Sequence, residues 1–116
     1  MVQIYGIKNC NTVKKALDWL TEKQIAYNFH DFKKEPATAA KLEEWEKQVT
    51  WELLVNKKGT TWKKLPAEEQ ALVVDAASAN TALLKNNSMI KRPIIEWNGS
   101  IILGFDEALY TDKLQK

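Results

Sequence analysis

The sequence is poor in the residues that build disulfides and metal sites. It contains one cysteine, Cys10, and one histidine, His30, among 116 residues. A single cysteine excludes an intramolecular disulfide, so the chain lacks the disulfide framework of a small secreted protein. No cysteine, histidine or acidic cluster accompanies His30 at ligand spacing, so we expect no metal site.

Long apolar runs and a strong charge of one sign are also missing. No apolar run approaches the roughly 20 residues that span a bilayer. Residues 1–5 lead directly into a strand-like segment, without the basic and apolar regions of a signal peptide. The formal net charge of +2 is far from the dense basic surface of a nucleic-acid binder. We therefore expect a cytoplasmic protein that contacts neither membrane nor nucleic acid directly.

The composition that is present is that of an ordinary globular domain. Hydrophobic residues make up 45% and charged residues 28% of the chain, which are common proportions. A chain of 116 residues is long enough to bury a core without covalent staples. We expect residues 1–116 to form a single domain and the protein to be a monomer.

The first third predicts a strand, a helix and a second strand. Residues 2–5 are rich in β-prone side chains, and alternation returns at residues 25–32. Between them, residues 11–23 are predicted to be helical, with Asn11 or Thr12 as the N-cap. Such a βαβ unit joins two parallel strands by a right-handed crossover. The apolar face of the helix follows a spacing of i, i+3, i+4 and i+7 at Val13, Ala16, Leu17 and Leu20.

The middle of the chain predicts helices only. Pro36 suits the first turn of a helix, and Pro66 is placed to open another one that runs through Val74. Residues 76–85 predict a further helix, whereas residues 56–61 have the chemistry of a polar loop. We expect residues 33–89 to form an all-helical insertion. The first of its helices carries apolar residues at helical spacing at Leu42, Trp45 and Val49.

The last third returns to strands. Asn98-Gly99 separates two β-rich runs, which predicts a tight hairpin because both turn positions need positive φ. Asp106 is then placed to cap a C-terminal helix. The order βαβ, helical insertion, ββα predicts the α/β class, with the four-stranded mixed sheet of a thioredoxin-like domain.

Cys10 lies in the loop after the first strand, which is the reactive position of such a domain. At the start of a helix, unpaired backbone N–H groups and the helix dipole favour the thiolate. Lys8 adds a positive charge nearby. A C-x-x-C site would place its resolving cysteine at position 13, where this chain has Val13. A covalent intermediate on Cys10 must therefore be released by an external thiol.

Six segments of the chain form a recognisable set of motifs. The first is YGIKNCNT at residues 5–12, and the others lie at 14–16, 56–65, 75–79, 90–95 and 103–105. These motifs resemble those of the arsenate reductase (ArsC)/Spx superfamily, most closely its YffB-like branch, and the match extends from the first strand to the start of the last helix.

The resemblance implies a thiol reductase that uses glutathione as co-substrate, without a bound cofactor. It implies that Arg92 faces Cys10 and that Pro93 follows a cis peptide bond beside it. Cys10 and Arg92 are then the catalytic residues, and the reductant is glutathione or a glutaredoxin-type protein. The predicted substrate- or glutathione-binding residues are Lys8, Asn9, Asn11, Thr12, Lys57, Lys58, Thr60 and Pro93.

Two other functions remain open for this superfamily. A glutaredoxin-dependent arsenate reductase would need an arginine set that is reduced here from three to one. Asn56 stands at one of those positions and Gly104-Phe105 at another. An Spx-like regulator would bind RNA polymerase through its α subunit, but Val13 removes the C-x-x-C redox switch that regulatory members carry.

Overall fold

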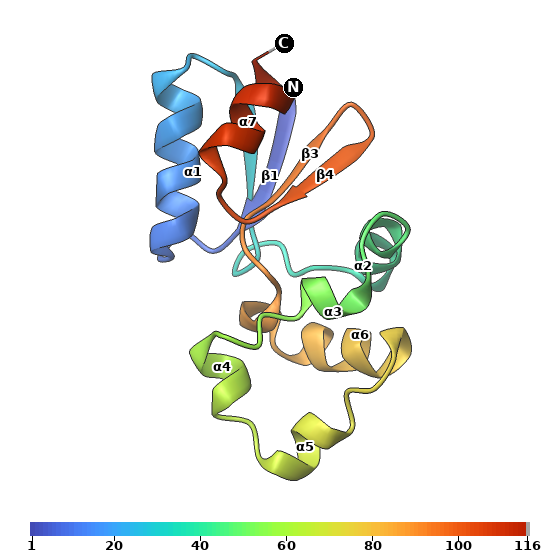
Figure 1. The fold of residues 1–116 in the computed structure, drawn as a ribbon. Helices are drawn as coiled ribbons and strands as arrows, with labels where there is room; N and C mark the ends of the chain where they lie inside the picture. Colours follow the sequence, from blue (N-terminus) through green and yellow to red (C-terminus); the bar gives the residue numbers. More distant parts are fainter. Residues whose placement is uncertain (116) are drawn as a thin grey trace. The chain divides into compact units, whose positions relative to one another are not determined.

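A computed structural model of the protein describes residues 1–115 (Figure 1). The chain divides into two compact units. The first comprises Met1–Lys34 together with the chain from Arg92 onward, and the second comprises Glu35–Lys91. The first unit contains the sheet, and the second contains only helices and one isolated bridge between Val55 and Ile90.

The first unit is built on a four-stranded mixed sheet with strand order β2-β1-β3-β4. β1 (Val2–Gly6) pairs in parallel with β2 (Tyr27–Asp31) and antiparallel with β3 (Ile94–Trp97). β3 continues antiparallel to β4 (Ser100–Leu103). This arrangement confirms the predicted α/β class and the four-stranded mixed sheet of a thioredoxin-like domain.

Two helices, α1 (Asn11–Glu22) and α7 (Glu107–Leu114), bury their apolar sides against one face of this sheet. The core contains no ionised side chain, and its one phenol, that of Tyr110, donates a hydrogen bond to the Gly104 carbonyl. The apolar stripe predicted for the first helix is therefore its core-facing side. The buried cluster consists of Val2, Ile4, Ala16, Trp19, Leu20, Ile95, Ile102, Tyr110 and Leu114.

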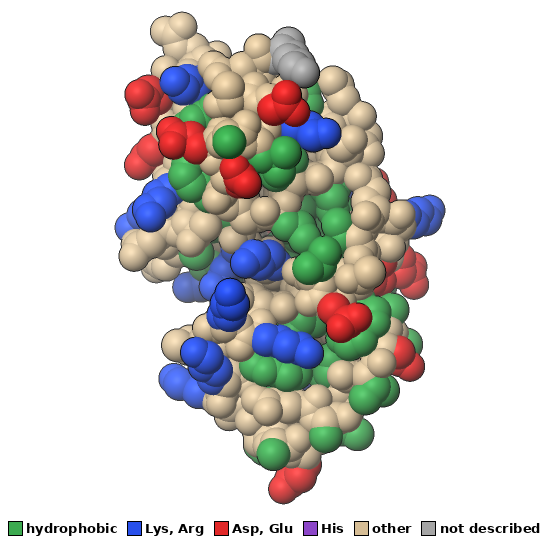
Figure 2. All heavy atoms as spheres, viewed as in Figure 1, with side chains coloured by type: hydrophobic (Ala, Val, Ile, Leu, Met, Phe, Trp, Pro, Cys, Tyr) green, Lys and Arg blue, Asp and Glu red, His purple; other side chains and the backbone are tan. Residues whose placement is uncertain are grey.

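The second unit consists of short helices that bury apolar side chains. These buried side chains include those of Leu42, Trp45, Leu54, Leu83 and Met89. Figure 2 shows apolar side chains on the surface together with charged side chains of both signs. The helices are α2 (Ala39–Glu46), α3 (Trp51–Leu54), α4 (Thr60–Lys63), α5 (Ala67–Ala71), α6 (Ala76–Lys85) and the 3₁₀ turn η1 (Asn87–Met89).

Turn and cap signals located the C-terminal elements correctly. Asn98 and Gly99 have φ angles of 48° and 77°, as the predicted hairpin turn requires. Asp106 is the N-cap of α7, and its carboxylate accepts a hydrogen bond from the backbone N–H of Leu109 at 3.0 Å. The helix predicted at residues 76–85 has those same bounds.

Three predicted helix starts or ends were wrong. The N-cap of α1 is Cys10, and neither Asn11 nor Thr12. α2 begins after Thr38, whose hydroxyl accepts a hydrogen bond from the Lys41 N–H at 3.2 Å. The helix therefore starts later than predicted from Pro36, because Thr38 supplies the side-chain oxygen that caps it. α5 ends at Ala71 before the predicted end, because Asp75 already forms the capping box of α6.

The second strand is shorter than predicted because its partner is short. β1 has five residues, and each pairs with one residue of β2, from Val2↔Tyr27 to Gly6↔Asp31. The next contact, from the Phe32 N–H to the Gly6 carbonyl at 2.8 Å, lies just beyond the ladder. The partner strand therefore limits the extended segment to residues 27–31.

Candidate functional site

Cys10 stands at the junction of β1 and α1. Its backbone is extended, with φ −122° and ψ 124°, and the helix begins at the next residue. Its carbonyl accepts the first helical hydrogen bond, from the Lys14 N–H at 2.9 Å. The thiol is half-buried and free. The fold thus places the only sulfhydryl of the sequence at the positive end of a twelve-residue helix.

Opposing effects set the acidity of this thiol, and the net result is a pKa below the ordinary value. Burial raises the pKa of Cys10, but the backbone N–H of Val13, the charge of Arg92 and the N–H of Thr12 lower it. A hydrogen bond from the Arg92 side chain lowers it further. Stabilising the thiolate in this way makes the nucleophilic form available.

Sheet register brings Arg92 to Cys10. β1 and β3 are antiparallel, and Tyr5 near the end of β1 is opposite Ile94 at the start of β3. The residues just before β3 therefore meet the loop that follows β1. Arg92, the only arginine of the sequence, lies there, and the Arg92–Pro93 peptide bond is cis, as the resemblance implied. The Pro93 side chain is buried.

A close contact between β1 and α1 fixes the loop that carries the cysteine. A Cβ atom on Gly6 would lie 2.8 Å from a methyl carbon of Val13, which is fully buried. Only glycine allows the strand and the first helical turn to approach this closely. Val13 therefore has two roles, since its side chain packs on Gly6 while its N–H is directed at the sulfur. The helical spacing placed Val13 on the apolar face of the helix, but nothing in the sequence indicated its contact with Gly6.

The other predicted contacts of the first unit lie around the thiol on exposed positions. Lys8, Asn9, Asn11 and Thr12 all have exposed side chains. The lowered pKa of Cys10 arises from Val13, Arg92 and Thr12, so the charge of Lys8 is not needed to explain it. Their predicted roles in holding a substrate or glutathione stay predictions.

The predicted basic contacts belong to the second unit. Lys57 and Lys58 are exposed at the turn before α4, and Thr60 is the first residue of that helix. The ammonium of Lys57 lies 5.4 Å from the centroid of the Trp62 ring, a cation–π contact. The tryptophan thus holds one lysine in place, and the predicted role of these residues in binding stays a prediction.

His30 takes part in packing within the sheet. Its ring stacks on Tyr5 with centroids 4.4 Å apart, and its Nε2 lies 2.6 Å from the Gln3 side-chain oxygen. Within residues 1–115, no three His, Cys, Asp or Glu side chains are grouped so that they could hold a metal ion. No helix in that range is long and apolar enough to cross a membrane.

With this geometry established, comparison with known proteins gives the family. The sequence profile of the ArsC family matches residues 5–112. The chain belongs to the ArsC family. A protein of Haemophilus influenzae, described as uncharacterized, is 42% identical over 110 residues, which cover 95% of this chain and 96% of that protein. These matches confirm the resemblance drawn from the motifs.

Solved structures of ArsC relatives share the fold over nearly the whole chain. A structure named YFFB (PA3664) protein has a TM-score of 0.93 and 38% identity, and covers 98% of this chain and 99% of its own. An arsenate reductase (ArsC) related protein from Brucella melitensis has a TM-score of 0.76 and 47% identity, with coverage of 99% and 95%. An arsenate reductase from Vibrio cholerae, at 18% identity and a TM-score of 0.77 with coverage of 98% and 95%, shows the fold alone. The family match and the relative from Brucella melitensis support a role like that of a thiol oxidoreductase.

Proposed function

We propose that this ArsC-family protein is a monothiol reductase in which Cys10 forms a mixed disulfide that glutathione resolves. The observation that carries the proposal is the half-buried Cys10 thiol, whose pKa is lowered by Arg92 and by N–H groups at the start of α1. The sequence contains no second cysteine. A stabilised thiolate without an internal partner is suited to exchange with an external thiol.

The proposed reaction has two exchange steps. The Cys10 thiolate attacks the glutathione sulfur of a mixed disulfide R–S–S–G, so that Cys10–S–S–G forms and the R–S⁻ leaving group takes up a proton. A second glutathione thiolate then attacks the glutathione sulfur of that intermediate, which releases glutathione disulfide and regenerates the Cys10 thiolate. In sum, R–S–S–G and one glutathione thiol become R–SH and glutathione disulfide, so the disulfide bond passes from the substrate to glutathione. Arg92 stabilises the thiolate before the first step and after the second.

Exposed polar side chains around the thiol suit a peptide ligand of this kind. Lys8 offers a charge for a carboxylate, and Asn9 and Asn11 offer amide donors and acceptors. Arg92 is the only arginine, which suits a thiol peptide better than a small tetrahedral oxyanion, because an oxyanion is best clamped by several guanidinium groups.

The proposal is tested by incubating the protein with glutathione disulfide and measuring the intact mass. We expect one glutathione adduct, located on Cys10 by peptide mapping and removed by reduced glutathione. Cys10→Ser is the control and should carry none. Absence of the adduct on native protein, or a Cys10 alkylation profile that titrates at the ordinary thiol pKa of about 8.5, would contradict the proposal.

Arsenate reduction is the second candidate, because the chain is 47% identical to a protein described as arsenate reductase related. Arsenate-dependent oxidation of NADPH, coupled through glutathione, glutaredoxin and glutathione reductase, measures it directly. Activity that disappears in Cys10→Ser would support this candidate. Equal arsenate reductase activity in the native protein and in Cys10→Ser would show that the activity does not come from Cys10, which would contradict this candidate.

A further inference from the structure

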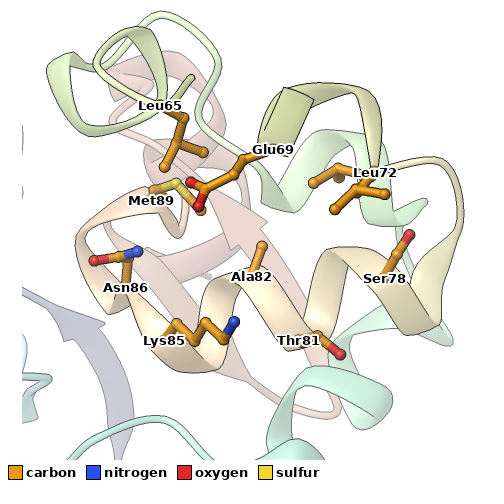
Figure 3. Close-up of a pocket in the computed structure, with 10 residues that line it drawn as sticks. Leu65, Glu69, Leu72, Ser78, Thr81, Ala82, Lys85, Asn86 and Met89 are labelled. Carbon is orange, nitrogen blue, oxygen red and sulfur yellow. The ribbon is translucent and has the colours of Figure 1, made fainter. Parts of the chain in front are cut away.

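The helical unit carries an open groove that the chemistry of Cys10 does not use. It has a cavity volume of about 370 Å³ and lies between α6 and the segment that contains α5 (Figure 3). At ~30 Å³ per water molecule, the groove holds roughly a dozen waters. All of its lining residues belong to the second unit: Leu65, Glu69, Leu72, Val73, Ser78, Thr81, Ala82, Lys85, Asn86 and Met89.

One face of α6 forms a side of this groove. Ser78, Thr81, Ala82 and Lys85 follow a spacing of i, i+3, i+4 and i+7, so they form one stripe along the helix. At 1.5 Å per residue, this stripe is about 10 Å long. Ser78 and Ala82 are small, so a ligand can approach the helix closely. The opposite face, with Ala79 and Leu83, is buried in the core.

Apolar side chains make up most of the remaining lining of the groove, beside Glu69 and Asn86. Leu65 and the buried Met89 lie at one end, and Leu72 lies at the other end near Ser78. Leu72 is 70% exposed and the neighbouring Val74 is 69% exposed. A contiguous apolar surface with a polar rim is characteristic of interaction sites.

The groove also carries one charge of each sign. Glu69 comes from α5 and Lys85 from the last turn of α6, and their side chains reach the groove from opposite sides. Both are exposed, and within residues 1–115 neither side chain forms a hydrogen bond or an ion pair. The charges are therefore available to a ligand that presents an acidic group toward Lys85 and a basic group toward Glu69.

We propose that this groove binds an amphipathic helix of a partner protein. Anchors at i, i+3 or i+4, and i+7 of such a helix extend over about 10 Å, which matches the length of the α6 stripe. Its apolar anchors enter between α5 and α6 and displace the water there. An acidic residue beside the anchors pairs with Lys85, and a basic residue on the other side pairs with Glu69.

The probe is a phage-displayed library of helical peptides of about 14 residues, or four turns, with varied apolar and charged positions. The library is selected against the full chain. We expect enrichment of sequences with apolar residues at i, i+3 or i+4, and i+7 and with charges of both signs at the flanks. Amide spectra of labelled protein with a selected peptide should change at Thr81, Ala82 and Lys85.

Three exposed substitutions test the groove itself. Leu72→Asp should weaken binding of the selected peptide at least about tenfold, since it places a charge against the apolar anchors of the peptide. The matched control Leu84→Asp changes an exposed leucine of the same helical unit outside the groove and should leave binding unchanged. Lys85→Glu should weaken binding by about two- to fivefold, and a peptide with the opposite charge at that position should restore it.

Three results would overturn the proposal. One is selection without a common helical apolar pattern. Another is a peptide that binds Leu72→Asp as tightly as the native chain. The third is a native chain that sediments as a dimer and becomes monomeric in Leu72→Asp, since a second copy of the chain would then occupy the groove.

Discussion

At the scale of single residues, Arg92 is the side chain that lowers the pKa of Cys10, alongside the N–H groups of Val13 and Thr12. Its charge and its hydrogen bond both lower the pKa of the thiol. Arg92→Gln should therefore raise that pKa and slow alkylation by iodoacetamide several-fold at neutral pH. Lys91→Gln is the matched control, because it removes a neighbouring positive charge that does not act on the thiol. Equal alkylation rates for Arg92→Gln and the native chain would show that the N–H groups at the start of α1 lower the thiol pKa without help from Arg92.

The lowered pKa of Cys10 also predicts how stability depends on pH. Below the folded-state pKa the thiol is protonated in both states and contributes nothing. Between the folded-state pKa and the higher unfolded-state pKa, the unfolded chain binds more protons, so the free energy of unfolding rises with pH.

Urea unfolding of the native chain and of Cys10→Ser over a pH series measures this difference. The native chain should gain stability relative to Cys10→Ser as the pH rises through that interval, and the gain should level off above it. If the stability of the native chain relative to Cys10→Ser decreased as the pH rises, burial would raise the thiol pKa by more than Arg92 and the N–H groups lower it.

At the scale of elements, the contact of Gly6 with Val13 joins β1 to α1. Gly6→Ala would place a methyl group 2.8 Å from a buried Val13 methyl carbon, so we expect a loss of about 1–3 kcal/mol in the free energy of unfolding. Val13→Ala removes the overlapping atoms. Gly6→Ala should therefore cost less in the Val13→Ala background, and a double-mutant cycle by urea unfolding measures the difference.

Gly99 is the control for this cycle. A Cβ there would meet nothing within 4 Å, but the φ of +77° disfavours other residues. Gly99→Ala should cost about 1 kcal/mol, and this cost should not depend on Val13. If both glycines respond alike to Val13→Ala, the close contact at Gly6 is not the cause of its cost.

Elements with their own local signals were predicted well. Asn98 and Gly99 adopt the positive φ angles that the predicted turn needs, and Asp106 caps its helix through a side-chain oxygen as predicted. These signals act within a few residues, so they can be read from the sequence. The helices between Trp51 and Ala71 are four or five residues long. Such short helices have too few turns to show a helical spacing of apolar residues in the sequence, and they are stabilised mainly by tertiary packing.

At the scale of the whole molecule, each unit buries apolar side chains of its own. Leu83 is fully buried in the helical unit, so Leu83→Ala should cost about 2–5 kcal/mol there. Native-state hydrogen exchange should show the loss of protection mainly in residues 35–91. An equal loss in β1 and β3 would mean that both units unfold as one cooperative structure.

The sequence by itself determined that the chain has one thiol and cannot form an intramolecular disulfide, and it determined the order of strands and helices. Each of these depends on counting residues or on contacts a few positions apart. The tertiary structure decided that Cys10 is the N-cap of α1 and that its neighbours are Val13 and Arg92. Arg92 reaches the thiol only because β1 and β3 pair antiparallel in one register. A pKa depends on charge and burial in space, so the acidity of the thiol follows from the fold.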